Sequence, residues 1–252
     1  MATTRSPFRD NALFQREITA FLAQHQSLFS QQIKKTSAFF EIACYNDLVK
    51  FYENTGFAVK PENAQSRGKE FVYALSPSAK PERCSYFVAT RTYQSQGGVS
   101  FEIRHNVRVQ SAHDAGVFVS PDYVVINPSA ITSVRDPNFY NGKVDYDFVP
   151  SSHVQTFAET KHYPPGPELI LNFVGLVNEL LPHLMTGAVP TALPKHLGPS
   201  LFISGVGNAH HERIRDSLAK RYSINVFLGL FARRSQVYAK GNQSNLTKVG
   251  TR

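Results

Sequence analysis

Two short stretches of the chain carry residues that could act on a phosphate. Asp122 follows Pro121 at the start of the apolar run YVVI, and Glu159 and Lys161 flank Thr160 in the run QTFAETKHY. On a β-strand, residues i and i+2 share a face, so we expect Glu159 and Lys161 to point the same way and Thr160 the opposite way. An adjacent strand that presented Asp122 beside them would bring two carboxylates and an ammonium group together.

Such a set predicts metal-dependent hydrolysis of a phosphodiester. Carboxylates are hard oxygen ligands, and Mg²⁺ takes one or two of them together with waters and phosphate oxygens. The metal would polarise the scissile phosphate and lower the pKa of a bound water. Lys161 would orient or help to deprotonate that water and neutralise charge on the phosphate. Glu41, in a predicted helix, could add a ligand or bind a second metal ion through water.

The order of these motifs resembles the PD-(D/E)xK nuclease superfamily: Asp122 on one strand, then Glu159-x-Lys161 on the next strand, then a helix. Many members also carry an acid in a helix just before a Gly-led first strand, as Glu41 stands before FYENTGFAV. The resemblance covers roughly residues 36–230 as an element order. It implies a restriction-endonuclease-like core, a Mg²⁺ or Mn²⁺ cofactor, DNA as the substrate and a role in restriction or genome defence. Cutting both strands would imply a homodimer, and RNA stays an alternative substrate.

Two further acids leave alternatives open. Asp114, in SAHDAGVFV, also precedes a predicted strand and is the alternative to Asp122 as the metal ligand, although Pro121 and the apolar run after it favour Asp122. Glu102, in FEIRHNV, is best interpreted as a solvent-facing position on an alternating strand. The stretch between Asp122 and Glu159 is longer than most loops, and a substrate-binding insertion is one interpretation of it.

The charge of the chain favours a polyanionic partner. Among 252 residues there are 27 Lys and Arg against 19 Asp and Glu, a formal net charge of +8, and such an excess is typical of proteins that bind nucleic acid. His210 and His211, at the start of a predicted basic helix, could contact phosphate or belong to a solvated helix face. The residues expected to hold the nucleic-acid backbone through salt-sensitive contacts are Arg213, Arg215, Lys220, Arg221, Arg233 and Arg234.

The composition excludes several other classes. The sequence is 42% hydrophobic, as in globular proteins, its apolar runs are too short to span a bilayer, and the first residues lack the apolar segment of a secretory signal. Cys44 and Cys84 cannot form a disulfide framework or a thiolate zinc site. We therefore expect a cytoplasmic protein in a reducing compartment, with no membrane partner.

Hydrophobic periodicity predicts a single α/β core in which helices flank a mixed central β-sheet. The expected division is an N-terminal helical extension over residues 1–35, the nuclease core over 36–235 and a basic flexible tail over 236–252. Helices are expected at 11–30, from Thr36 or Ser37 to Gly56, at 167–185 with Pro182 ending it early, and over HHERIRDSLAKRY. Strands are expected at FAVKP, FVYAL, YFVATRTY, GVSFEIRHNVRVQ, GVFV, PDYVVIN, VQTFAETKHY, SLFISGV and SINVFLGLF, with a turn-rich connection over 128–152.

Two rival interpretations make different demands. NDLVKFYENTGFAV resembles the helix–strand signature of vicinal-oxygen-chelate metalloenzymes, but these need a repeated module, and the second half of the chain contains no second copy. A non-catalytic nucleic-acid-binding protein with a nuclease-like fold would explain the net charge, and Glu159 and Lys161 would then be an ordinary ion pair.

Overall fold

The fold is seen in a computed structural model of the chain. It describes residue 16 and residues 36–63, 71–74, 76–93, 97–186, 192–230 and 246–250. Apart from residue 16, the helix predicted over 11–30 lies outside the described residues, and so do Arg233 and Arg234.

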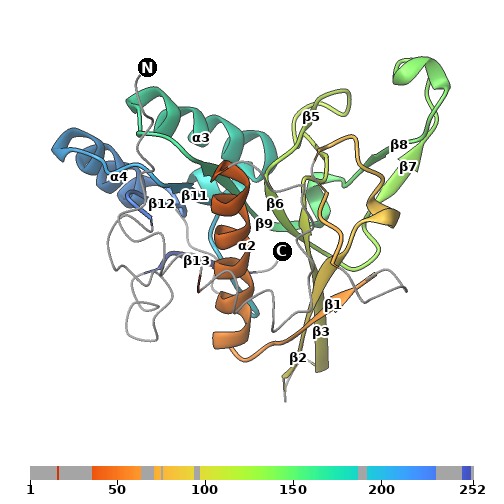
Figure 1. The fold of residues 1–252 in the computed structure, drawn as a ribbon, viewed down its shortest axis with the longest axis horizontal. Helices are drawn as coiled ribbons and strands as arrows, with labels where there is room; N and C mark the ends of the chain where they lie inside the picture. The colour runs from red at the N-terminus through yellow and green to blue at the C-terminus, as the bar shows by residue number, and fades with distance from the viewer. Residues whose placement is uncertain are drawn as a thin grey trace.

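A mixed seven-stranded sheet forms the centre of the molecule (Figure 1). Neighbouring strands from β1 to β9 run antiparallel, whereas β11 lies parallel to β9 and β12 lies parallel to β11. The predicted α/β fold with a mixed central sheet is therefore confirmed. In spatial order the strands are β1 (Ala58–Glu62), β2 (Tyr86–Tyr93), β3 (Gly97–His105), β6 (Tyr123–Ile126), β9 (Val154–Lys161), β11 (Ser200–Ile203) and β12 (Asn225–Phe227).

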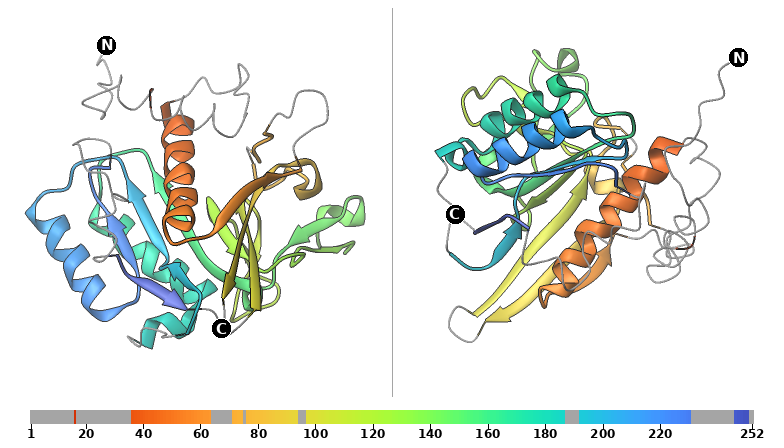
Figure 2. Two further views of the ribbon diagram at one scale, coloured as in Figure 1. Left: turned by 90° about the horizontal axis from the view of Figure 1, so that it is seen from below. Right: turned by 90° about the vertical axis from the view of Figure 1, so that its left-hand side faces the viewer.

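Different helices cover the two faces of the sheet (Figure 2). α2 (Thr36–Asn54) packs on one face, and α3 (Pro167–Leu180) and α4 (Ala209–Arg221) pack on the other. There is a hydrophobic core on each face of the sheet, and successive residues of β6 contribute to the two in turn. Tyr123 and Val125 face α2, while Val124 and Ile126 face α3. Both faces of this strand are fully buried, which explains why YVVI is an uninterrupted apolar run.

The ends of the helices follow the expected signals. α2 is followed by Gly56, whose φ of +90° lies in the left-handed region that favours glycine. α3 begins at Pro167, and Pro182 opens the short 3₁₀ helix η4 (Pro182–Thr186), so α3 ends before residue 185 as predicted. α4 begins after Asn208, whose side chain accepts hydrogen bonds from the backbone amides of His210 and His211.

The connection predicted over 128–152 contains an arm that the sequence did not reveal. β7 (Thr132–Val134) and β8 (Tyr146–Phe148) pair antiparallel and project from the sheet (Figure 1). The 3₁₀ helix η2 (Tyr140–Gly142) turns the chain at its tip. Beside the arm, β4 (Val109–Gln110) pairs with β5 (Phe118–Val119). The ring centroid of Phe118 lies 5.0–5.4 Å from those of Phe139, Tyr146 and Phe148, and the Phe139 and Tyr146 rings stack at 4.2 Å.

Four other segments differ from the expectation. The single strand predicted over GVSFEIRHNVRVQ is two strands, β3 and β4, which belong to different sheets. Residues 71–74 of the predicted strand FVYAL are not in a strand, although Val72 exchanges backbone and side-chain hydrogen bonds with Ser85. β10 (Lys195–Leu197) was not predicted. It pairs with β13 (Lys248–Gly250), so part of the segment expected as a flexible tail forms a strand.

The remaining short elements are the 3₁₀ helices η1 (Pro81–Arg83) and η3 (Ser151–His153). Both cysteines are buried and free. Within the described part of the chain, no helix has the length and apolar character needed to cross a membrane.

Candidate active site

The strands β6 and β9 bring Asp122, Glu159 and Lys161 together. Tyr123 pairs with Ala158, which places Asp122 at the entrance to β6 next to Glu159 near the end of β9. The ammonium Nζ of Lys161 lies 2.6 Å from Glu159 Oε2 and 3.8 Å from Asp122 Oδ2. The predicted meeting of two carboxylates and one lysine is therefore present, even though the β7–β8 arm separates their strands in the sequence.

Thr160 is a member of the site that the sequence analysis missed. Its backbone amide and its hydroxyl Oγ1 both donate to Asp122 Oδ2, at 2.6 and 2.8 Å. These two bonds fix the Asp122 carboxylate against β9. The alternation of the strand predicted that Thr160 points away from Glu159 and Lys161. The one feature of the sequence that could have indicated its role is that it carries a hydroxyl group and lies between two charged residues.

Burial sets the electrostatics of the cluster. It raises the pKa of Glu159 to about 7, with the negative charge of Asp122 as the next cause and Lys161 opposing both. Burial lowers the pKa of Lys161, but the charges of Asp122 and Glu159 outweigh it, so this pKa lies above its ordinary value. Lys161 therefore stays charged near neutral pH, while Glu159 is poised to gain or lose a proton there.

Glu41 reaches the same region from the opposite face of the sheet. Its backbone carbonyl accepts a hydrogen bond from the hydroxyl of Tyr123, the residue after Asp122. Its carboxylate lies 3.7 Å from Nε2 of the buried His105. The charges of Asp122 and Glu41 both add to the burial that raises the pKa of the Cys44 thiol, so this buried thiol lies within electrostatic reach of both acids.

The two other acids occupy different places. Asp114 lies in the exposed turn before β5, where its Oδ1 accepts from the amide of Gly116, and none of its described contacts is with the cluster. The expectation that Glu102 faces solvent is wrong. Glu102 is buried, and its carboxylate accepts from Arg104 Nε at 2.6 Å and from the Ser129 amide at 3.0 Å.

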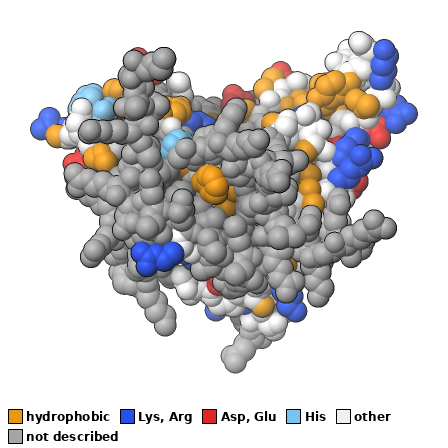
Figure 3. Space-filling model, in the orientation of Figure 1, with side chains coloured by type: hydrophobic (Ala, Val, Ile, Leu, Met, Phe, Trp, Pro, Cys, Tyr) orange, Lys and Arg blue, Asp and Glu red, His pale blue; other side chains and the backbone are white. Residues whose placement is uncertain are grey.

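Of the basic residues expected to contact nucleic acid, the four that the structure describes lie along α4. Arg213, Lys220 and Arg221 are exposed, whereas Arg215 is half-buried and pairs with Asp216 at 2.8 Å. Lys and Arg side chains appear near α4 and again over the β7–β8 arm (Figure 3). At the helix start, Asn208 accepts from the backbone amides of His210 and His211, and His211 Nδ1 accepts from the Asn208 amide, so these two amides and this ring nitrogen are less free to bind phosphate.

Asp122 and Glu159 are the two side chains of the cluster that could bind a divalent cation such as Mg²⁺. A cationic nitrogen already lies between the carboxylates of Asp122 and Glu159, so positive charge is favoured at this point. Two carboxylates are the usual protein contribution when waters and phosphates complete the Mg²⁺ shell. No set of three or more His, Cys, Asp or Glu side chains among the described residues is placed to hold a metal on its own.

Comparison of the chain with protein-family models, with curated proteins and with solved structures finds no match.

Proposed function

We propose that the protein is a metal-dependent endonuclease that hydrolyses phosphodiester bonds in DNA. The observation that carries the proposal is the position of the Lys161 ammonium, 2.6 Å from Glu159 and 3.8 Å from Asp122, at the ends of two adjacent strands. One lysine and two acids at the ends of two interior strands of a sheet match the groups that phosphodiester hydrolysis needs.

The order of elements around the cluster supports the same proposal. α2 is followed by five strands of the central sheet, β1, β2, β3, β6 and β9, each antiparallel to the next, and α3 then leads to β11, which lies parallel to β9. A restriction-endonuclease-like core has the arrangement of β3, β6, β9, α3 and β11, with the Asp at the second strand and the acid-x-Lys on the third, and β1 and β2 would be additions to it. The backbone carbonyl of Glu41 in α2 also accepts a hydrogen bond from the hydroxyl of Tyr123, next to Asp122, while the Glu41 carboxylate lies 3.7 Å from His105 Nε2.

Each residue then has a defined task. Asp122, oriented by Thr160, and Glu159 would hold Mg²⁺, and the ion, when bound, would supply polarisation of the phosphate and a more acidic water. Glu159 must first lose its proton, which its pKa of about 7 permits near neutral pH. Lys161 keeps its charge and donates hydrogen bonds to the attacking water or to the phosphate. Arg213, Lys220 and Arg221 would add salt-sensitive backbone contacts.

The alternative is a nucleic-acid-binding protein without catalysis. The exposed basic residues of α4 favour binding in either case. In that alternative the carboxylates would repel phosphate, so Glu159→Gln would leave binding unchanged or improve it.

A cleavage assay on plasmid DNA and on single-stranded RNA, with Mg²⁺, Mn²⁺ or EDTA, tests the proposal. Lys161→Ala and Glu159→Gln should each slow cutting by at least about 100-fold, as expected when an acid–base or charge-stabilising group is removed. Asp114→Asn is the matched control, because this acid lies outside the cluster, and it should cut like the wild type. Thermal unfolding of each variant shows that the fold is intact.

Three outcomes would contradict the proposal. The first is no cutting in any metal together with salt-sensitive DNA binding that survives all substitutions, which would favour the binding protein. The second is loss of cutting in Asp114→Asn with full activity in Asp122→Asn. The third is cutting of RNA alone, which would overturn the assignment of DNA as the substrate.

A further inference from the structure

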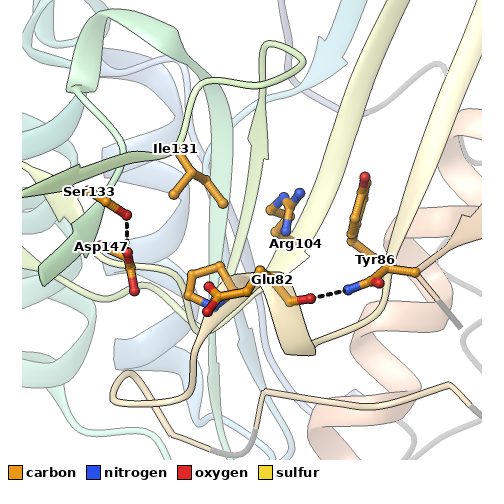
Figure 4. Close-up of a pocket in the computed structure, with 8 residues that line it drawn as sticks. Glu82, Tyr86, Arg104, Ile131, Ser133 and Asp147 are labelled. Carbon is orange, nitrogen blue, oxygen red and sulfur yellow. Dashed lines mark hydrogen bonds between the residues drawn. The ribbon is translucent and has the colours of Figure 1, made fainter. Parts of the chain in front are cut away.

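A pocket of about 520 Å³ lies between the sheet and the base of the β7–β8 arm. Figure 4 shows Tyr86 and Arg104 on one side, Ile131, Ser133 and Asp147 on the other, and Glu82 between them. Its eight lining residues are Asn63, Pro81, Glu82, Tyr86, Arg104, Ile131, Ser133 and Asp147. A volume of this order is within the range of pockets that bury a small planar ligand.

Arg104 is fixed in the wall of this pocket. Its Nε donates to the buried Glu102 at 2.6 Å, and its guanidinium carbon lies 3.6 Å from the centroid of the Tyr86 ring. The Arg104 side chain is 11% exposed. Within the described residues, its terminal nitrogens Nη1 and Nη2 make no hydrogen bond. The guanidinium group is fixed in position, and these two donors are available to a ligand in the pocket.

Glu82 supplies the complementary acceptor. It belongs to η1, which is anchored because the Asn63 amide donates to the carbonyl of Glu82 at 2.7 Å and to that of Cys84 at 2.9 Å. The Glu82 carboxylate forms no ion pair with a described residue. Asp147, in contrast, is already occupied, because it accepts from Ser133 Oγ and lies 3.5 Å from Lys80 Nζ.

We propose that this pocket holds the guanine base of a nucleic-acid strand. Guanine is planar and offers acceptors O6 and N7 on one edge, the commonest specific partners of an arginine. Its neighbouring edge carries the N1 and N2 donors, which match the two acceptor oxygens of a carboxylate such as Glu82. Adenine lacks this pair of donors, and Ile131 and Pro81 provide apolar surface for a ring.

The position of the pocket relates it to the candidate active site. Arg104 pairs with Val124, which lies two residues after Asp122, about 7 Å along the strand at the usual rise. A strand whose phosphate lies at Asp122 can therefore place a nearby base in the pocket. The inference rests on the proposed function, since it names a base that the nuclease would select near its cleavage point.

The test measures binding in EDTA with the Lys161→Ala protein, so that cleavage plays no part. The probes are single-stranded DNA hexamers of thymidine with one central guanine, inosine, 7-deazaguanine or adenine, and guanosine alone. Inosine lacks the N2 donor and 7-deazaguanine lacks the N7 acceptor, so each should bind about tenfold more weakly than guanine if one charge-assisted hydrogen bond is lost. Guanosine alone should show the same preference over inosine at lower affinity, because it lacks the phosphates.

Two variants locate the effect. Glu82→Gln changes an exposed side chain and should abolish the preference for guanine over inosine, while Arg104→Lys should abolish the preference for guanine over 7-deazaguanine. Glu212→Gln, an exposed acid on α4, is the matched control and should keep both.

Equal binding of all hexamers, or a preference for guanine over inosine that survives Glu82→Gln, would overturn the inference. Guanosine that binds as tightly as the hexamer would also overturn it, because the pocket would then be a nucleoside site and not a substrate site. A protein that selects guanine here but never cuts nucleic acid would refute the proposed function and leave the pocket assignment standing.

Discussion

The carboxylate of Asp122 accepts two hydrogen bonds from a single residue, Thr160, through both its backbone amide and its hydroxyl. The acid at the start of β6 is thus oriented by the residue that separates Glu159 from Lys161 on β9. Because both bonds end on Oδ2, the other oxygen, Oδ1, keeps its acceptor capacity for a metal-bound water or a metal ion.

Thr160→Val removes the hydroxyl bond and keeps the shape of the side chain. We expect a loss of cleavage rate of about tenfold, because Asp122 would keep its amide bond and lose one positioning contact of about 1–2 kcal/mol. Thr160→Ser restores the hydroxyl and should recover most of the rate. Single-turnover cleavage in saturating Mg²⁺ measures this effect, and equal rates for Val and Ser would show that the hydroxyl does not position Asp122.

Metal affinity should depend on pH through Glu159. Its pKa is raised to about 7 by burial and by Asp122, and a protonated carboxyl cannot bind Mg²⁺, so binding must release a proton below this pH. We expect the apparent Mg²⁺ affinity to fall by about tenfold per unit as the pH drops below 7, and to level off above it. Calorimetric titration at pH 6, 7 and 8 measures the effect, with Glu159→Gln as the variant that should bind weakly without this pH step. An affinity that is constant over this range would contradict the assignment of Glu159 as a ligand.

His196 should make the folded state sensitive to acid. It is buried beneath α2 with Nδ1 2.6 Å from the Tyr52 hydroxyl, and burial lowers its pKa to about 3. The unfolded chain takes up a proton near pH 6.5 and the folded chain does not, so stability is full above pH 6.5 and falls as the pH drops towards 3. Between pH 6.5 and 5 the loss should be about 2 kcal/mol.

Urea unfolding of the wild type and of His196→Gln, which can still accept from Tyr52, measures this contribution. The variant should lose less stability than the wild type over the same interval. His210→Gln, which changes an exposed histidine, should behave like the wild type. Identical acid sensitivity in wild type and His196→Gln would rule out His196 as the cause.

Two glycines should respond oppositely to alanine. At Gly205 a Cβ would lie 2.5 Å from Pro164 Cα and 2.6 Å from the Tyr163 carbonyl, so Gly205→Ala should destabilise the fold by about 1–3 kcal/mol. At Gly175, exposed within α3, an added Cβ would have no atom within 4 Å, so Gly175→Ala should stabilise by about 0.5–1 kcal/mol. Melting temperatures of both variants provide the comparison, and shifts of the same sign would contradict it. Because Tyr163 and Pro164 closely follow Lys161, Gly205→Ala should also reduce cleavage.

The sequence predicted the elements whose residues carry a long and regular pattern. α2 has possible capping residues at Thr36 and Ser37 and the stop signal Gly56. β9 was recognisable as a strand because it is rich in β-branched and aromatic residues. The three-residue strands β7 and β10 were missed because a run of that length has no measurable period. The turn at the tip of the arm also depends on Tyr140 and Asn141, which adopt positive φ values of 50° and 53°. These backbone conformations could not be predicted from the residue types.

The candidate site was predictable in part for a related reason. Glu159 and Lys161 are two residues apart on one strand, so their proximity follows from local geometry. The proximity of Asp122 to these two residues depends on the register between β6 and β9. The role of Thr160 depends on the direction in which the Asp122 side chain points. The burial of Glu102 depends on Arg104 and on the distant Ser129, so alternation along β3 alone gave the wrong answer.

The position of β9 inside the sheet has a consequence for the nascent chain. Its neighbours are β6, made earlier, and β11 (Ser200–Ile203), made about forty residues later after the whole of α3. Lys161 and Glu159 therefore leave the ribosome well before the strand that supports their other side. Since non-local pairing is slow and domains fold as units, the proposed catalytic groups should stay unassembled until most of the chain has been synthesised. In the proposed nuclease, such latency would keep an incomplete chain from cutting nearby nucleic acid.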